Sequence, residues 1–539
     1  MADAAVLEGQ QPPAPVRTAT RRPSRPLAVT AAVVGVATAL PAAYLVVKAF
    51  DEGPQRVLDT LASGRATELL VRTALLAGAV TATAVAIAVP IAWLTVRTDL
   101  PARKILTVLT ALPLVIPSYV GGYAFVAALG PRGVLQSWLA PLGVERLPSI
   151  YGFGGAWLVL SLFTYPLVLL PTRSALRGLD PSLEEAARSL GRRPVRVFVG
   201  VTLPQLRPAV VSGGLLVALY TLADFGAVSL LRFDTFTRGI YTRLRTFDAA
   251  GAATLGLVLV VLMLMVLGFE GRTRGRAAYH RSHASSPRVP TTTRLGAWRW
   301  PALVGCVLLV VVALGLPAGV IGYWLSRAIA VGDPIGGTLS LGWHSLQASA
   351  VAAATGVLCA WPVALLSSRH PGPFARTIER LSHTGYALPG IVVALTLVFF
   401  GVRYVPFAYQ TRAMLVFAYV VLFVPQAIGS LRASLLQVPP SLEEASRSLG
   451  SGAWRTFRRV VFPMVRPGAL TGGALVFLTA MKELPATLLL APAGFSTLAT
   501  QVWNSTSAAF FTRAAAPALG LILLSSVPMA LLVARDRGR

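Results

Sequence analysis

Long apolar runs separated by short polar segments dominate the hydrophobic pattern of the chain. A membrane-spanning helix needs roughly 20 mainly apolar residues. Several runs contain Pro and Gly, as in "LPLVIPSYVGG" at 112–122, which membrane helices tolerate when their neighbours satisfy the freed backbone groups. The pattern therefore predicts an all-α polytopic membrane protein with about twelve transmembrane helices. The predicted spans are 27–48, 69–96, 105–129, 151–172, 208–231, 251–269, 301–325, 344–367, 384–402, 411–431, 467–491 and 514–534.

Composition supports this interpretation. The chain is 55% hydrophobic and 13% charged, with a mean hydropathy of +0.67, whereas soluble domains carry about 25% charged residues. The net charge of +27 would suit a nucleic-acid-binding protein, but the basic residues form short clusters between apolar runs. Membrane topology explains such clusters, so we expect a lipid bilayer and no nucleic acid as partner. Because more spans follow the basic N-terminus, its apolar run is a first span and no signal peptide.

The distribution of basic residues predicts the orientation in the membrane. With the N-terminus inside, 33 of the 48 Lys and Arg residues fall in inner segments. Positively charged loops stay in the cytoplasm, which places both termini there. One outer loop, 232–247, carries four Arg against this rule.

A charged segment occurs twice, as "PSLEEAARSLG" at 181–191 and "PSLEEASRSLG" at 440–450. Over 37 positions the two copies are identical at 20. "VPIAWL" at 89–94 also aligns with "WPVALL" at 361–366. Each half has six predicted spans, so the repeats are parallel and related by an axis along the membrane normal. The predicted division is a tail at 1–26, a first repeat at 27–270, a linker at 271–300, a second repeat at 301–534 and a tail at 535–539.

Each copy of the segment predicts a short amphipathic helix. Leu183, Ala186, Ala187 and Leu190 are spaced as one stripe of a helix. Pro at its start and Gly at its end suit the first turn and the stop, and Ser182–Glu185 and Ser441–Glu444 have the spacing of a capping box. Such a helix could lie on the bilayer or pack under its own bundle with Glu185 as a mere cap. Two retained copies favour a docking role.

This segment resembles the EAA loop of ABC importer permeases, here at 181–208 and 440–467. The resemblance implies a type I importer fold and two cytoplasmic ATPase subunits that dock on the loops. The second copy departs from the pattern at Ser446 and Phe462. The docking residues that the resemblance implies are Glu185, Ala186, Ala187, Gly191, Pro204, Glu444, Ala445, Ser446, Gly450 and Pro463.

The chain itself lacks the means to hydrolyse ATP. A phosphate-binding loop needs a Gly-Lys pair, and the three lysines follow Val47, Arg103 and Met481. We therefore expect no enzyme activity, no catalytic residue and no cofactor bound by this chain, with ATP used by the partner ATPase.

The stretches 223–241 and 481–503 resemble the fused permeases of ferric-iron importers, which are close to those for thiamine. The resemblance implies one permease chain per complex, a bacterial inner membrane and an extracytoplasmic binding protein that delivers the ferric iron. A permease for thiamine, polyamine or another small solute is an alternative. A secondary transporter would need midplane carboxylates for a coupling ion and gives no reason for twin EAA loops, and a membrane enzyme would need clustered reactive residues.

Asp224 and Glu483 occupy equivalent repeat positions and are the candidate residues of the translocation pathway. Ionisable groups within spans usually face the bundle interior or a water-filled path. Alternatively, the neighbouring bases Lys482 and Arg232 hold them in a packing role.

Other possible iron ligands are weaker. Tyr119, Tyr123 and Tyr241 could offer phenolates, but tyrosines at span ends are commonly interfacial anchors. His280 and His283 form an HxxH in the linker without further ligands nearby, and Cys306 and Cys359 lie in apolar runs. We therefore expect no metal site of the ordinary closed kind.

Overall fold

The computed structural model describes residues 23–131, 133–144, 147–180, 182–277, 292–333 and 336–537. Every regular element in these ranges is a helix. The helices of the first half are α1 (Arg25–Ala49), α2 (Pro54–Ala62), α3 (Gly64–Arg97), α4 (Arg103–Leu109), η1 (Leu112–Val115), α5 (Ser118–Leu129), α6 (Val134–Leu139), η2 (Ala140–Leu142), α7 (Phe153–Thr164), α8 (Pro166–Gly178), α9 (Ser182–Ser189), α10 (Pro194–Val197), η3 (Phe198–Thr202), α11 (Leu203–Ala223), α12 (Gly226–Leu230), α13 (Phe236–Arg245) and α14 (Ala249–Ala277).

The second half repeats this order after the linker. Helix α14 runs into the predicted linker, of which 278–291, with His280 and His283, lie outside the described residues. The helices that follow are η5 (Gly296–Trp298), α15 (Arg299–Val310), η6 (Val311–Gly315), α16 (Leu316–Val331), α17 (Gly337–Arg369), α18 (Pro373–Ser382), η7 (Thr384–Ala387), α19 (Gly390–Tyr404), α20 (Arg412–Leu436), α21 (Pro440–Ser448), α22 (Ala453–Thr456), η8 (Phe457–Val461), α23 (Phe462–Met481), α24 (Pro485–Leu490), α25 (Leu498–Ser507) and α26 (Phe511–Arg537).

The helices account for the predicted spans. Among the described residues, nine helical stretches are long and apolar enough to cross a membrane, and the bent pair Arg103–Val115 and Ser118–Ser137 is a tenth. The shorter apolar helices Gly390–Tyr404 and Phe511–Ser526 coincide with the two remaining predictions. The all-α polytopic architecture is therefore confirmed.

Two of the predicted spans break at their acidic residue, which corrects the sequence prediction for them. Span 208–231 was expected to be continuous, but α11 ends at Ala223, and Asp224 has an extended backbone before α12 begins. Span 467–491 breaks in the same way between α23 and α24, where Pro485 starts the new helix. Both breaks occur at the predicted pathway carboxylates, so these residues lie at helix ends and not along continuous helices.

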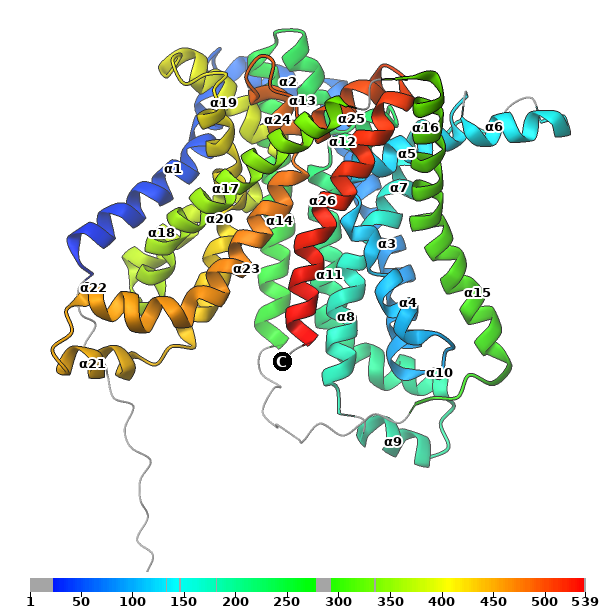
Figure 1. The fold of residues 1–539 in the computed structure, drawn as a ribbon, viewed down its shortest axis with the longest axis horizontal. Helices are drawn as coiled ribbons and strands as arrows, with labels where there is room; N and C mark the ends of the chain where they lie inside the picture. Colours follow the sequence, from blue (N-terminus) through cyan, green and yellow to red (C-terminus); the bar gives the residue numbers. More distant parts are fainter. Residues whose placement is uncertain are drawn as a thin grey trace, which may run out of the picture.

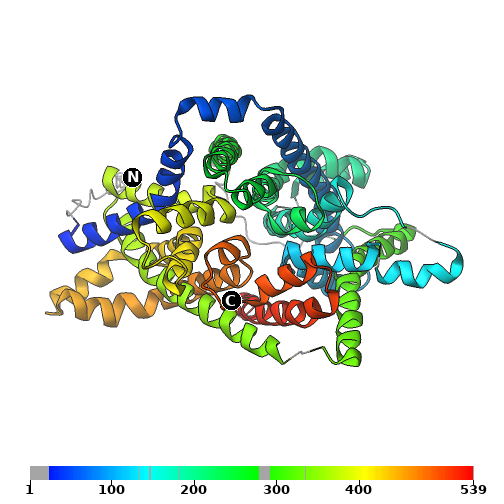
Figure 2. The ribbon, with the colours of Figure 1, turned by 90° about the horizontal axis from the view of Figure 1, so that it is seen from above.

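The two halves exchange their first helices. α1 packs against α17, α18 and α19 of the second half, and α16 packs against α5 of the first half. Figure 2 shows α1 running along the yellow second-half helices, while the red α26 lies beside the cyan and blue first-half helices. The hydroxyl of Thr384 donates to the Thr38 carbonyl at 3.2 Å across this contact. The halves therefore form one interlocked bundle.

The EAA segments lie at the same end of the bundle, on opposite sides of it. α9, α10, α21 and α22 project from the lower end in Figure 1, and α2, α13, α24 and α25 lie at the opposite end. This arrangement brings the two copies to the same face, as the parallel repeat predicts.

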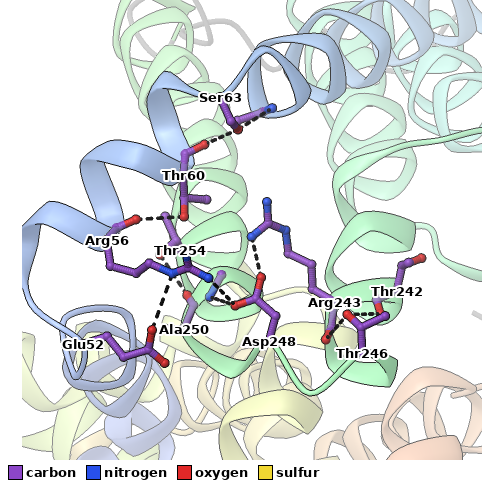
Figure 3. A network of polar contacts seen from close by, with 12 residues as sticks. Glu52, Arg56, Thr60, Ser63, Thr242, Arg243, Thr246, Asp248, Ala250 and Thr254 are labelled. Carbon is purple, nitrogen blue, oxygen red and sulfur yellow. Dashed lines mark hydrogen bonds and ion pairs between the residues drawn. The ribbon is translucent and has the colours of Figure 1, made fainter.

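Ion pairs hold two of the four arginines of 232–247 that break the charge rule, Arg238 and Arg243. Arg243 lies 2.7 Å from Asp248, and Arg56 of α2 reaches the same carboxylate at 3.5 Å (Figure 3). Glu52 pairs with Arg56 in turn, and Arg238 pairs with a further acidic residue four positions earlier. These arginines join α2, α13 and α14 into a cap at this end of the bundle.

Candidate functional site

Helices α9 and α21 end as the repeated glycines predict. Gly191 and Gly450 have φ values of +77° and +79°, a left-handed conformation that glycine adopts without steric cost. The amide that follows each glycine donates back over five residues, to the carbonyl oxygens of Ala187 and Ser446 respectively. This is the pattern of a Schellman stop, so α9 and α21 both end at a fixed place.

The first glutamate of each segment anchors its helix to the bundle. Glu184 is buried, 3.6 Å from the guanidinium of Arg97 at the end of α3, and accepts a hydrogen bond from Thr202 at 3.1 Å. Glu443 lies 2.8 Å from Arg369 at the end of α17. The same Arg–Glu pair therefore fixes both α9 and α21.

Sequence reasoning missed this anchor, although the repeat contained the signal. Arg97 and Arg369 both follow the aligned segments at 89–94 and 361–366, three residues after their ends. Each guanidinium also donates to an equivalent carbonyl, that of Leu179 at 3.3 Å and that of Val438 at 3.0 Å. The charge pattern alone uses these two arginines only to predict the orientation of the chain in the membrane.

The second glutamate and the leucines face away from the bundle. Leu190 and Leu449 are 80% and 86% exposed, and Glu185 and Glu444 are exposed as well. These leucines therefore do not pack under their own bundle. The other predicted docking residues divide between the two sides: Ala186, Ala445, Gly191 and Gly450 are exposed, Ala187 is buried, Ser446 is half-buried, and Pro204 and Pro463 are exposed in the first turns of α11 and α23.

The predicted capping box of the second copy is not formed. α21 begins at Pro440 with Pro439 as its N-cap, and no side chain caps it. Proline has a fixed φ that suits the first helical position, so the helix starts one residue earlier and Ser441 lies inside it. Pro181 of the first copy lies outside the described residues.

Asp224 and Glu483 each cap the short helix that follows their break. One Asp224 oxygen accepts from the amides of Ala227 and Val228 at 3.0 and 3.2 Å. Glu483 accepts from the Ala486 amide at 3.1 Å. A carboxylate favours a helix N-terminus because the first amides lack partners there. Both side chains therefore satisfy backbone amides at the start of the helix that follows their break.

A compensating pair of residues distinguishes the two repeats. The hydroxyl of Ser118, at the start of α5, donates to Asp224. The equivalent of Ser118 is Gly390, at the start of α19, and a Cβ there would lie 2.4 Å from a Glu483 oxygen. The longer acid therefore faces the smaller residue. Asp224 with Ser118 and Glu483 with Gly390 therefore fill the same space in the two repeats.

The neighbouring bases do not hold these carboxylates. Lys482 donates to the Leu114 carbonyl of the first half at 3.3 Å, and the Arg232 guanidinium lies over the Tyr151 ring at 4.7 Å. Within the described part of the chain, no ion pair involves Asp224 or Glu483. The alternative in which Lys482 and Arg232 hold the two carboxylates is therefore wrong as to these two partners.

The tyrosines considered as interfacial anchors lie deeper than expected. Tyr119 and Tyr123 are buried inside the bundle, so the anchor interpretation is wrong for both. Tyr123 donates to the Phe511 carbonyl at 2.9 Å, and Tyr241 is half-buried beside Arg245. In the ranges that the structure describes, no three His, Cys, Asp or Glu residues gather as a metal site.

Known proteins resemble the chain over most of its length. A family model for the inner membrane component of binding-protein-dependent transport systems matches residues 84–273 and 352–538. The Fe(3+)-transport system permease protein FbpB 2 of Haemophilus influenzae is 33% identical over 95% of this chain and 98% of its own. The putative ferric transport system permease protein FbpB 1 of the same organism is 23% identical over 82% of this chain and 73% of its own.

A shorter relative matches only part of the chain. The molybdenum transport system permease protein ModB of Escherichia coli is 34% identical over 33% of this chain and 79% of its own. One repeat therefore corresponds to most of a permease, as expected for two fused units. With both repeats matched, the chain belongs to the binding-protein-dependent inner membrane components, the permease family of ABC importers, and is a fused member of it.

Proposed function

We propose that this chain is the permease of an ABC importer for ferric iron. The observation that carries the proposal is the similarity to the ferric permease FbpB 2, which extends over 95% of this chain and includes both repeats. The buried Asp224 and the half-buried Glu483 support a cationic substrate. Molybdate is an anion, which two carboxylates at the breaks would repel.

The proposal includes the arrangement of the complex. Both termini and both docking helices lie in the cytoplasm of a bacterial cell, where two ATPase subunits dock on α9 and α21. An extracytoplasmic binding protein delivers iron to the opposite end. The excess of Lys and Arg in the inner segments supports this orientation, and the position of α9 and α21 at one end of the bundle agrees with it.

Uptake by cells tests the substrate. Cells without other importers would express the chain with its ATPase and binding protein, and would be offered labelled ferric iron, thiamine, molybdate or sulfate in turn. We expect ATP-dependent uptake of ferric iron alone. Uptake of thiamine without iron would favour the alternative solute.

The stoichiometry follows from the fusion. We expect one copy of this chain with two ATPase subunits, because α9 and α21 already provide both docking helices. Native mass spectrometry of the purified complex measures this ratio directly. Two permease chains for each ATPase pair would contradict the proposal.

A further inference from the structure

A groove lined by basic side chains lies on the first half of the bundle. Its volume is about 700 Å³, and its walls come from α4, with Thr95 near the end of α3 and Arg177 near the end of α8. Figure 1 shows α4 between α8 and α15. α4 begins shortly after Arg97, whose guanidinium pairs with Glu184 of α9. The groove therefore lies toward the end of the bundle that carries α9 and α21.

Three exposed cations of the groove have no carboxylate partner. Arg103 and Lys104 lie in the first turn of α4, and Arg177 lies in the last turn of α8. In the part of the chain that the structure describes, none of the three forms an ion pair. Their positive charge is therefore left to a ligand from outside the chain.

A fourth cation is buried behind the groove. Arg173 of α8 is 3% exposed. Its guanidinium donates to the hydroxyls of Thr95 and Thr110, at 3.0 and 2.7 Å, and to the carbonyl of Thr107 at 2.8 Å. Thr95 and Thr107 both line the groove. All three partners are neutral, whereas a buried charge is normally paired with an opposite one. The guanidinium therefore adds an uncompensated positive charge beside the groove.

The second half neutralises the equivalent arginine with a carboxylate of its own. The alignment of the EAA segments, extended upstream, matches Arg173 with Arg432. The second alignment, through the ends of α3 and α17, matches Thr107 with Glu379. Arg432 of α20 and Glu379 of α18 form an ion pair. The first half therefore lacks an anion at a place where the second half has one.

The exposed cations follow the same division between the halves. Arg103 corresponds to Ala375 and Arg177 to Leu436, which are both apolar. Lys104 has a basic counterpart in Arg376. The extra cations are thus found in the half that lacks the acid, which makes this groove complementary to an external anion.

The apolar walls of the groove suit a lipid. Ile105 and Val108 line it and remain 62% and 41% exposed. Trp298 and Trp300, at the junction of η5 and α15, are exposed as well, and α15 contacts α4. Tryptophan is enriched at the membrane–water interface, which places the groove at that depth. A free anion would use only the cations, whereas a lipid would use the apolar walls too.

We propose that this groove binds an anionic phospholipid, with the phosphate against the three exposed cations and an acyl chain along Ile105 and Val108. Basic pockets between membrane helices at the cytoplasmic side bind such headgroups. The phosphate gives the first half the negative charge that Glu379 gives the second. The bound lipid thereby holds α4 against α8, as the ion pair of Glu379 and Arg432 holds α18 against α20.

Native mass spectrometry measures the binding. The full-length chain, in complex with its ATPase, is stripped of lipid in neutral detergent and titrated with phosphatidylglycerol or, in parallel, with phosphatidylcholine. We expect the wild type to bind phosphatidylglycerol in preference, and Arg103→Gln with Lys104→Gln to bind it roughly tenfold or more weakly. Arg376→Gln with Arg380→Gln is the matched control, because it removes the same charge from exposed positions of α18. This control should bind the lipid as the wild type does.

A second variant supplies the missing acid. Thr107→Glu gives α4 the carboxylate that Glu379 gives α18, so Arg173 gains a partner within the chain. We expect weaker binding of phosphatidylglycerol although every exposed cation is retained.

Three results would overturn the proposal. They are equal binding of the two lipids by the wild type, unchanged affinity for phosphatidylglycerol in Arg103→Gln with Lys104→Gln, and displacement of the bound lipid by inorganic phosphate, which would assign the groove to a free anion. The measurement contains no transported solute, so its outcome leaves the proposed function untouched.

Discussion

The double substitution Leu190→Asp and Leu449→Asp is expected to abolish association with the ATPase subunits while the permease still folds. Both leucines lie at the ends of the docking helices and are 80% and 86% exposed, so the bundle itself gains nothing from them. Burying a leucine at an interface is worth about 1.5–3 kcal/mol, and an unpaired carboxylate there costs more. Two such losses would weaken docking by more than about 100-fold.

Co-purification of the ATPase with the tagged permease measures this effect. Leu142→Asp is the matched control, because Leu142 is also highly exposed but belongs to η2, which directly follows α6 at the opposite end of the bundle (Figure 1). The variants should elute in detergent as the wild type does. If the ATPase still co-purifies in normal amounts, the leucines lie on the bilayer surface, the alternative that the sequence left open.

The sequence could predict the docking helices because their signal is local and occurs twice. Gly191 marks the C-terminal end of α9 and Gly450 that of α21, and the spacing of Leu183 and Leu190 indicates one helical face. The anchor at Glu184 could not be predicted from the segment itself, because its partner Arg97 is distant in the chain. The pairing can be recognised only when the repeats are also aligned at the second offset, which matches Arg97 with Arg369. Glu184 faces the bundle and Glu185 faces away from it because of this contact with Arg97, which the local sequence does not reveal.

The pathway was less predictable for a physical reason. Hydropathy averages over a window, so a single Asp224 inside an apolar run leaves the predicted span 208–231 continuous. Only the structure shows that its carboxylate caps α12 and thereby permits the break. Likewise, the relation between Gly390 and Glu483 is a matter of side-chain volume, which no hydrophobic pattern records.

Replacing both pathway carboxylates, Asp224→Asn with Glu483→Gln, is expected to remove ferric-iron uptake almost completely. Each amide keeps a carbonyl oxygen that can still accept from the amides of Ala227 and Ala486, so the caps on α12 and α24 are retained. The negative charge alone is lost. Alanine would remove charge and cap together and would confuse the two effects. We therefore expect a loss of roughly 100-fold or more in the double variant and a smaller loss in each single variant.

A charge-retaining variant separates the role of charge from that of side-chain length. Ser118→Gly with Asp224→Glu transfers the second-half arrangement of Gly390 and Glu483 into the first half. Because a longer acid then faces a smaller residue, as it does in the second repeat, this variant should keep most of its uptake. Radioactive iron uptake is compared with ATPase association measured in parallel. Normal uptake in Asp224→Asn, Glu483→Gln would reduce both carboxylates to helix caps, whereas lost uptake with intact assembly requires their charge in the path of the ion.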